Sequence, residues 1–535
     1  MLPRDLIARC ARTFADKIAF IDGDRRVTWR DLDDRSNRLA AALQHLGVGR
    51  GDVVAILSPV HLETIEHWHA CLKIGAVRTA INWRYAAAEM LHIIRDCDAR
   101  VIIVRDLCAA ALSAEWNQLR AEGRILIGIG ARHGFRYDYE SLLADHAEPP
   151  EWPPLTEDDL LCIGYTTGTT GRSKGVLLSQ RAVREALIHT VTSAGLRPTD
   201  VWAQATSGIG VPTLSLLNSV NGMTTVLPEG SFDARRFLGH VEQHKVTAVL
   251  MVATMLRRVI EEVTSGHWDT RSLRVLAYGS MPTPPALVRA AHAAFGCDLQ
   301  HWYGATEGTL GLFTCLTAGE HRQALAHDPA LLSSCGRPAL HVEIRICDDD
   351  GRPVPPGEVG TVCVKGDVVM KGYLNRPDET AATLRDGWLR LHDLGRIDER
   401  GYLYLVDRKN FMIITGAFNV YPTVVEHALA EHPAVNEVAV VGAAHPEWGE
   451  AVVAVVSLRP GATATALQLI EFCRGRVGTF EIPKHVEFLP ELPQGRTGKI
   501  DKKALVECFR AQPERLPWNA APPLGDSNRL AKATS

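Results

Sequence analysis

The chain has 535 residues, more than one hydrophobic core usually serves, so we expect at least two domains. Apolar residues make up 46% of the chain and charged residues 22%, as in ordinary soluble globular proteins. A formal net charge of -4 gives no sign of a basic surface for nucleic acid, nor of an acidic excess for a basic partner.

The cysteines and the amino terminus indicate a cellular compartment. Twelve cysteines are spread from Cys10 to Cys508 without a C-x-x-C spacing, which is typical of free thiols that fill apolar space in a reducing cytosol. Arg4 and Asp5 place charges where the apolar region of a signal peptide would lie, and no apolar run reaches the ~18 residues of a membrane span. We expect a cytoplasmic protein without a membrane span.

The predicted elements alternate between helix and strand. Thr28 and Asp31 have capping-box spacing before a helical apolar period that ends at Gly47. Short unbroken apolar strands are predicted at 52–57, 100–104, 247–252 and 274–279, with helices such as 286–294 between them. Such strands favour parallel sheets covered on both faces, where ligands bind at the carboxyl ends of the strands.

Two later segments break this alternation. Residues 336–406 are punctuated by Gly and Pro and contain short alternating strands at 342–346 and 360–364, which favours an antiparallel or barrel-like subdomain. Residues 511–535 are rich in Pro, Ala and Asn, and we expect them to be loose.

The most informative run is 165–175, Tyr-Thr-Thr-Gly-Thr-Thr-Gly-Arg-Ser-Lys-Gly. Its glycines let a loop fold tightly and expose backbone N–H groups, its hydroxyls add donors, and Arg172 and Lys174 add positive charge. This is the chemistry of a polyphosphate cradle, although the Walker A pattern cannot be threaded through it. The alternative is a flexible surface loop without a ligand.

Three further segments carry groups that suit a nucleotide site. Residues 302–308, Trp-Tyr-Gly-Ala-Thr-Glu-Gly, place an aromatic ring, a tight turn, a hydroxyl and a carboxylate together, and a carboxylate can hold Mg²⁺ beside phosphate oxygens. Residues 388–393 and 406–411 add acidic and basic groups. Residues 492–500 present Lys499 in a Gly-rich turn, for which the alternative is a solvated loop lysine.

In this order and spacing, the segments resemble the AMP-forming adenylating superfamily of acyl-CoA synthetases, luciferases and peptide-synthetase adenylation domains. The resemblance runs from about residue 10 to 510. It implies an α/β fold with a large amino-terminal AMP-binding domain (1–409) of two α/β sheets plus a small β-barrel. A smaller mobile α+β lid domain (410–510) would follow, then a loose tail (511–535), with a hinge at Asn410 that lets the domains alternate.

The resemblance also implies ATP, Mg²⁺ and coenzyme A as ligands, and it assigns roles. Lys499, Glu307, Thr306 and Lys174 would be catalytic: Lys499 would bridge the carboxylate and the α-phosphate, Glu307 would bind Mg²⁺, and Thr306 would meet the α-phosphate. Tyr303, with Gly304 after it, would lie against adenine, and Asp393 would accept from the ribose with Arg408 nearby. Lys174 would hold the β- and γ-phosphates with Thr166, Thr167, Gly168, Thr169, Thr170 and Gly171.

The sequence departs from the family pattern at several positions. Asn410 stands where Asp or Lys is usual at the hinge, and Asn tolerates unusual backbone angles. Leu391 and His392 stand where Thr-Gly is usual before the ribose-binding Asp393, and Ala417 replaces a glycine after Gly416, on the face expected near the thiol step. None of these changes removes a charged catalytic group.

The acyl substrate is inferred from one uncharged stretch. Residues 201–228 contain no Asp, Glu, Lys or Arg, and family precedent places a wall of the acyl pocket here. An amino acid substrate would need an acidic partner for its ammonium group, so an apolar carboxylate is favoured: fatty, aromatic or alicyclic, such as a steroid-derived acid. The alternative is that the stretch is simply core. The expected pocket residues are Gly208, Val211, Val252, Gly279, Ser280 and Met281.

The sequence therefore predicts an acid–thiol ligase that forms acyl-AMP and passes the acyl group to CoA, in fatty acid or lipid metabolism. One alternative is a standalone adenylating enzyme that loads an acyl carrier protein. Another is a catalytically idle nucleotide-binding relative, which the retention of all the expected charged residues disfavours. Partners would be small molecules, with neither nucleic acid nor membrane, and the resemblance also admits a homodimer.

Overall fold

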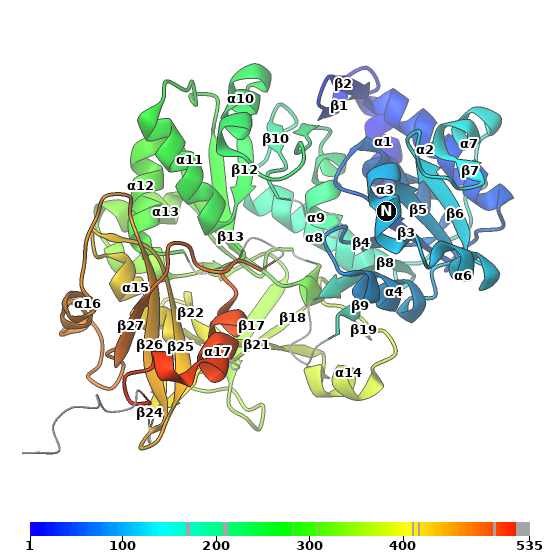
Figure 1. The fold of residues 1–535 in the computed structure, drawn as a ribbon. Coiled ribbons are helices and arrows are strands. Elements are labelled where there is room, and N and C mark those ends of the chain that lie inside the picture. Colours follow the sequence, from blue (N-terminus) through cyan, green and yellow to red (C-terminus); the bar gives the residue numbers. More distant parts are fainter. Residues whose placement is uncertain are drawn as a thin grey trace, which may run out of the picture. The chain divides into compact units, whose positions relative to one another are not determined.

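The computed structural model describes residues 1–166, 172–206, 212–281, 283–309, 311–408, 411–415, 418–495 and 499–519, with the backbone alone at 408, 418 and 419. The chain divides into two compact units, Met1–Leu405 and Val406–Ser535, each with its own sheets and cores (Figure 1). All twelve cysteines are free and most are buried, as expected. Among the described helices, none combines the length and apolarity that crossing a bilayer requires.

The first unit contains an eight-stranded sheet that carries both ends of the Thr/Gly run. Its strands, in spatial order, are β19 (Gly372–Tyr373), β9 (Lys174–Ser179), β8 (Leu160–Thr166), β4 (Val77–Ile81), β3 (Val53–Leu57), β5 (Val101–Arg105), β6 (Ile125–Ile129) and β7 (Tyr137–Asp138). The strands from β8 to β7 are parallel, whereas β9 and β19 run antiparallel at one edge.

A nine-stranded sheet forms the second layer of this unit. In order, its strands are β16 (Arg337–Pro338), β15 (Thr314–Leu316), β14 (Asp298–Tyr303), β13 (Val275–Gly279), β12 (Ala248–Met251), β10 (Val201–Ala203), β11 (Thr224–Val226), β1 (Ile18–Asp22) and β2 (Arg25–Thr28). The strands from β14 to β1 are parallel, so their carboxyl ends share one edge. Unbroken apolar runs predicted this arrangement, because parallel strands are covered on both faces.

Helices cover these sheets, and Figure 1 shows α10, α11 and α12 along one side of the nine-stranded sheet. Thr28 caps α2 through the Asp31 N–H in the predicted capping box, and α2 ends at His45 just before Gly47. The helices of the first unit are α1 (Pro3–Thr13), α2 (Trp29–His45), α3 (Leu62–Ile74), α4 (Ala87–Asp96), α5 (Asp106–Ala109), α6 (Trp116–Ala121), α7 (Tyr139–Asp145), α8 (Gln180–Ser193), α9 (Pro212–Ser215), α10 (Ala234–His244), α11 (Ala253–Ser265), α12 (Pro285–Phe295), α13 (Ala318–Ala326) and α14 (Pro377–Thr383).

The segment punctuated by Gly and Pro forms the predicted antiparallel subdomain. Its five-stranded sheet contains β17 (Val342–Cys347), β18 (Gly360–Gly366), β21 (Trp388–Ile397) and β20 (Leu384–Arg385), with β22 (Leu403–Arg408) paired to β21. The two-residue strand β19 leaves this segment and joins β9 of the eight-stranded sheet. A strand of two residues is too short to show a periodic pattern, so the sequence did not reveal this connection.

The second unit is an α+β layer structure. Its sheet is formed by β24 (Phe418–Val420), β23 (Ile413–Thr415), β26 (Gly449–Leu458) and β25 (Val435–His445), with β27 (His485–Phe488) paired to β26. One face buries residues of α15 (Pro422–Ala430) and α16 (Ala466–Cys473), and the other buries α17 (Lys502–Ala511). Alternate residues of β25 and β26 enter the two cores, as the period of a strand requires.

The carboxyl-terminal tail departs from its expected looseness over its first residues. Pro513–Arg515 forms a 3-10 turn, Leu516 is buried in a core of the second unit, and the Trp518 indole donates to the Ala444 carbonyl over 2.9 Å. Two large apolar side chains therefore hold a segment whose composition, dominated by Pro, Ala and Asn, suggested disorder. Residues 520–535 lie outside the described residues.

Candidate active site

The Thr/Gly run begins and ends on a β-hairpin. Thr166 ends β8 and Lys174 begins β9, and these residues pair across the antiparallel strands. Before β9, the Ser173 N–H donates to Glu89 Oε1 over 2.9 Å, and the Ser173 carbonyl lies 3.0 Å from His92 Nε2, so helix α4 holds this end of the run. The expected phosphate ligands between the two ends, Thr167, Gly168, Thr169, Thr170 and Gly171, lie outside the described residues.

Lys174 belongs to a chain of contacts that the sequence analysis missed. Its ammonium group pairs with Glu379 of α14 and lies 5.3 Å from the centre of the Tyr373 ring. The Tyr373 hydroxyl donates to Glu307 Oε1 over 2.9 Å. Burial and the nearby Glu307 carboxylate raise the pKa of Tyr373, so the phenol stays protonated and keeps donating. One tyrosine thus links the expected phosphate ligand to the expected metal ligand.

Only a weak sequence signal could have found these partners. The Lys174 side chain is 13% exposed, and an ammonium group at that depth needs an anionic partner. The sequence offers many carboxylates, and Glu379 is one among them. It is the pairing of β19 with β9, Tyr373 opposite Val176, that brings this segment to the lysine.

The turn after β14 carries a second set of predicted residues. Tyr303 ends the strand, Gly304 follows, and Thr306–Gly308 forms a 3-10 turn in which Thr306 is half-buried. The Met370 N–H donates to the Glu307 carbonyl over 2.8 Å and so holds the backbone that carries the carboxylate. The turn therefore places the backbone of Glu307 and its side chain against the same segment of chain.

The fold brings Asp393 of β21 to the end of β14. The Tyr303 hydroxyl donates to Asp393 Oδ2 over 2.6 Å, and both residues are buried, at 8% and 9% exposure. The Tyr303 ring also contacts the Phe313 ring edge-on, with 5.9 Å between centroids. The predicted adenine and ribose residues are thus neighbours. Of the two departures before Asp393, Leu391 is buried in the core and His392 is exposed.

Four of the six predicted acyl-pocket residues lie at the carboxyl ends of β12 and β13. Val252 follows β12 and is buried, whereas Ser280 is exposed with a positive φ of 63° and Met281 is half-buried. Gly279 ends β13 opposite Trp302, so close that a Cβ at Gly279 would lie 2.0 Å from the Trp302 carbonyl oxygen. Gly208 and Val211 lie outside the described residues.

This close approach predicts that Gly279→Ala destabilises the first unit by about 2 kcal/mol or more, because the added Cβ meets backbone and strands β13 and β14 must separate. Thermal or denaturant unfolding measures the effect. Gly239→Ala in α10 is the matched control: a Cβ there meets nothing within 4 Å, so the change should stabilise the helix by about 0.5–1 kcal/mol. Equal effects of the two substitutions would contradict the packing argument.

In the second unit, Lys499 lies beside a short antiparallel bridge. Gln494 and Ile500 form an antiparallel bridge, and the Gly495 N–H donates to the Lys499 carbonyl over 2.6 Å. Helix α17 begins directly afterwards, capped by Asp501 through the Ala504 N–H. Described contacts therefore hold the backbone on both sides of Lys499, whereas residues 496–498 lie outside the described residues. The Arg408 side chain and residues 409, 410, 416 and 417, which include the predicted hinge Asn410, lie outside the described residues.

Two family models match the chain along most of its length. The model of the AMP-binding enzyme matches residues 7–374, and the model of the AMP-binding enzyme C-terminal domain matches residues 424–499. The first match covers both ends of the Thr/Gly run and the β14 turn. The second ends at Lys499.

Curated and solved proteins are similar over nearly the whole chain. The indoleacetate–CoA ligase of Aromatoleum aromaticum is 35% identical, over 90% of this chain and 92% of its own. A fatty acid–[acyl-carrier-protein] ligase of Streptomyces coeruleorubidus is 32% identical, over 91% and 92%. The ATP-bound crystal structure of MatB from Rhodopseudomonas palustris matches with a TM-score of 0.86 and 28% identity, over 95% of this chain and 99% of that one.

Proposed function

The chain belongs to the AMP-binding enzyme family, and we propose that it is an ATP-dependent carboxylic acid:CoA ligase that forms AMP. A carboxylate is a poor acyl donor, because its charge is delocalised and its leaving group would be oxide. Its attack on the α-phosphate of ATP gives an acyl-AMP and releases pyrophosphate, and the CoA thiol then displaces AMP. Charge builds on phosphate oxygens in the first step, so positioning and electrostatic stabilisation should dominate.

The observation that carries this proposal is the contact chain from Lys174 through Tyr373 to Glu307. It sets a cation for phosphate beside a carboxylate for a metal ion, next to the ends of the Thr/Gly run. Among the described residues, no three metal-ligating side chains cluster. Mg²⁺ would therefore be held by Glu307 together with substrate phosphates and water, as is usual for this ion, and would supply neutralising charge to those phosphates.

The remaining roles follow the same assignment. Lys174 and the 166–171 loop hold the β- and γ-phosphates, and Thr306 meets the α-phosphate. Tyr303 lies against adenine, and Asp393, held by the Tyr303 hydroxyl, accepts from the ribose with Arg408 nearby. Lys499 bridges the carboxylate and the α-phosphate during adenylation, and the backbone bridge between Gln494 and Ile500 lies beside it.

We further propose that the two units alternate between the two half-reactions. The compact units divide between Leu405 and Val406, just before Asn410, which supports a hinge at that point. Rotation there would withdraw the Lys499 turn after adenylation and present the face near Gly416 for the thiol step. The free thiols of this chain support a cytoplasmic location for both steps.

An apolar acid is the proposed substrate. Residues 201–228 carry no charged side chain, and β10 and β11 from this stretch lie in the nine-stranded sheet beside β12. Relatives are named for indoleacetate and for fatty acids, which are apolar acids of different shape. We therefore propose an aromatic, alicyclic or fatty carboxylate.

Tyr373→Phe tests the contact that carries the proposal. Removing the hydroxyl leaves Glu307 Oε1 without this donor, so we expect kcat/KM for ATP to fall by about tenfold and the Mg²⁺ concentration for half-maximal rate to rise. Pyrophosphate release during a Mg²⁺ titration measures both. Because the aromatic ring remains, the melting temperature should change little. An unchanged Mg²⁺ dependence would show that Tyr373 does not position Glu307.

The alternative function is transfer of the acyl group from acyl-AMP to an acyl carrier protein, because one similar protein is a fatty acid–[acyl-carrier-protein] ligase. An assay of AMP release from ATP and Mg²⁺ with a panel of apolar acids, run with CoA or with a carrier protein as the acceptor, distinguishes the two functions. We expect CoA to accelerate AMP release and acyl-CoA to accumulate, with little effect of a phosphopantetheinylated carrier protein. If only the carrier protein accelerates AMP release, the chain is a carrier-protein ligase and not a CoA ligase.

A further inference from the structure

The 3-10 turn Thr306–Gly308, which carries Glu307, ends at a residue with an unusual backbone conformation. Thr309 follows the turn with φ 64° and ψ 11°, in the left-handed region. Seven described residues other than glycine have a positive φ, and the other six are all exposed, whereas Thr309 is 1% exposed. A β-branched side chain is disfavoured in this region, so the conformation costs free energy that neighbouring contacts must offset.

The contacts that hold Thr309 come from the turn itself and from α9. The Thr309 N–H donates to the Thr306 carbonyl over 2.9 Å, and the Thr309 hydroxyl donates to the Gly308 carbonyl. The Thr309 carbonyl accepts from the Thr213 hydroxyl over 3.3 Å. A Cβ at Gly308 would lie 2.1 Å from the Phe313 ring, so the turn is also packed closely on one side. These contacts together keep an unfavourable backbone conformation in place.

The conformation of Thr309 determines where the chain leaves the turn, and Glu307 lies only two positions earlier. The Glu307 carbonyl accepts from the Met370 N–H over 2.8 Å, and its carboxylate accepts from the Tyr373 hydroxyl over 2.9 Å. If residue 309 moved to an ordinary backbone region, the chain would leave the turn in another direction. Glu307 would then lose its alignment with the segment that contains Met370 and Tyr373.

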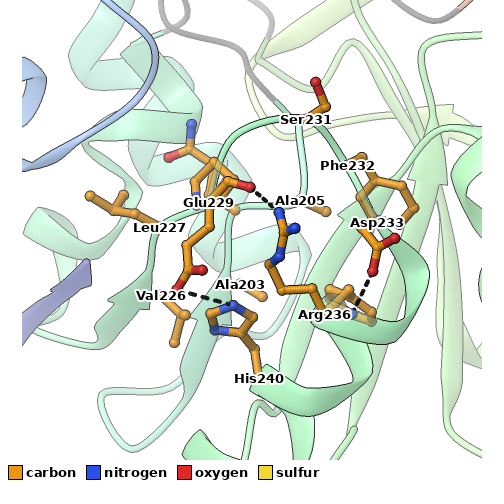
Figure 2. A pocket seen from close by; sticks show the side chains of 13 residues that line it. Ala203, Ala205, Val226, Leu227, Glu229, Ser231, Phe232, Asp233, Arg236 and His240 are labelled. Carbon is orange, nitrogen blue, oxygen red and sulfur yellow. Dashed lines mark hydrogen bonds and ion pairs between the residues drawn. The ribbon is translucent and has the colours of Figure 1, made fainter. Parts of the chain in front are cut away.

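The uncharged stretch 201–228 reaches this turn through α9. Thr213 lies in α9 and is 3% exposed, and its hydroxyl supplies the contact to the Thr309 carbonyl. Elsewhere in the stretch, the ends of β10 and β11 face α10 across a cavity of about 40 Å³, which has room for a few water molecules but not for an acyl chain (Figure 2). The hydrogen bond from Thr213 therefore ties the proposed wall of the acyl pocket to the turn.

We propose that Thr309 is a positioning residue for the metal-binding carboxylate: its left-handed backbone aims Glu307 at the ion and the phosphates, and its hydroxyl holds that backbone. The proposal rests on the proposed function, in which Glu307 binds Mg²⁺. Glycine adopts the left-handed region without strain, whereas valine has the shape of threonine but lacks the hydroxyl. A conformational role therefore tolerates glycine better than valine, and a packing role tolerates valine better than glycine.

The test measures binding of ATP to the full chain by calorimetry, without acid, in Mg²⁺ and in EDTA. We expect Thr309→Gly to bind Mg²⁺·ATP within about twofold of wild type, and Thr309→Val to bind it about tenfold more weakly. ATP in EDTA should bind equally to all three proteins, because Glu307 acts through the ion. Without ligand, Thr309→Val should have a lower melting temperature than Thr309→Gly.

Thr190 is the matched control, because it is a buried threonine with an ordinary helical backbone. It lies in α8, is 3% exposed, and its hydroxyl donates to the Ala186 carbonyl over 2.7 Å. Here the order of stability should be reversed, with Thr190→Val melting above Thr190→Gly, and both variants should bind Mg²⁺·ATP as wild type does.

Thr309→Ala provides the same comparison if Thr309→Val does not fold. Its Cβ disfavours the left-handed region, so it should bind Mg²⁺·ATP several-fold more weakly than Thr309→Gly. The proposal is overturned if the valine or alanine variant binds Mg²⁺·ATP as tightly as the glycine variant, or if glycine is the most damaging of the three. Failure of the proposed function looks different, because wild type itself would then release no pyrophosphate with any apolar acid.

Discussion

Lys499→Ala should lower acyl-AMP formation by at least about a hundredfold, while transfer from preformed acyl-AMP to CoA proceeds at nearly the wild-type rate. In the proposed first step, negative charge accumulates where the carboxylate oxygen meets the α-phosphate, and only a cation placed there stabilises it. In the proposed second step, the turn that carries Lys499 is withdrawn. Pyrophosphate release measures the first half-reaction, and acyl-CoA formation from chemically prepared acyl-AMP measures the second.

Lys503→Ala, on the exposed face of α17, is the matched control for the loss of a nearby lysine, and both half-reactions should continue. The Gly495 N–H contacts the Lys499 carbonyl, and Gln494 pairs with Ile500, through backbone atoms alone, so the alanine variant should keep these contacts. Equal loss of both half-reactions in Lys499→Ala would refute a role confined to adenylation.

Glu307→Gln should reduce pyrophosphate release by about a hundredfold or more and weaken its dependence on Mg²⁺. The substitution keeps the size of the side chain and its ability to accept from Tyr373, but it removes the negative charge that a hard cation requires. The rate over a range of Mg²⁺ concentrations, at saturating acid, gives the measurement.

Glu379→Gln is the matched control, because Glu379 is the other carboxylate of the same contact chain. In this variant Lys174 loses its ion-pair partner Glu379, which would otherwise compete with the phosphate oxygens of ATP for the ammonium group. We expect KM for ATP to fall a few-fold with kcat little changed, which is the opposite direction to Glu307→Gln. If the glutamine variants behave alike, the assignment of Glu307 rather than Glu379 to the metal is wrong.

Local patterns predicted much of the fold. The Thr28 capping box, the apolar runs that became β3, β5, β12 and β13, and the helix after Pro285 depend on residues close in sequence. Runs buried on both faces also predicted parallel sheets, since a half-exposed strand would alternate. The antiparallel segment could also be predicted from local sequence, because Gly and Pro mark the turns between its short strands.

The contacts that assemble the site could not be predicted in this way. Tyr373 reaches Glu307 across 66 positions and Tyr303 reaches Asp393 across 90, so no local period records either pairing. The constraint on Gly279 comes from a backbone oxygen of the neighbouring strand, which a sequence does not display.

Acid-dependent exchange of labelled pyrophosphate into ATP, without CoA, tests the central claim most directly. That exchange requires the chain to form acyl-AMP reversibly from ATP and a carboxylate, with every proposed ligand of the triphosphate in place. The account predicts exchange with apolar acids, none without acid, and loss of exchange in Lys499→Ala. Absence of exchange with every apolar acid tested, from folded protein with Mg²⁺ present, would contradict it.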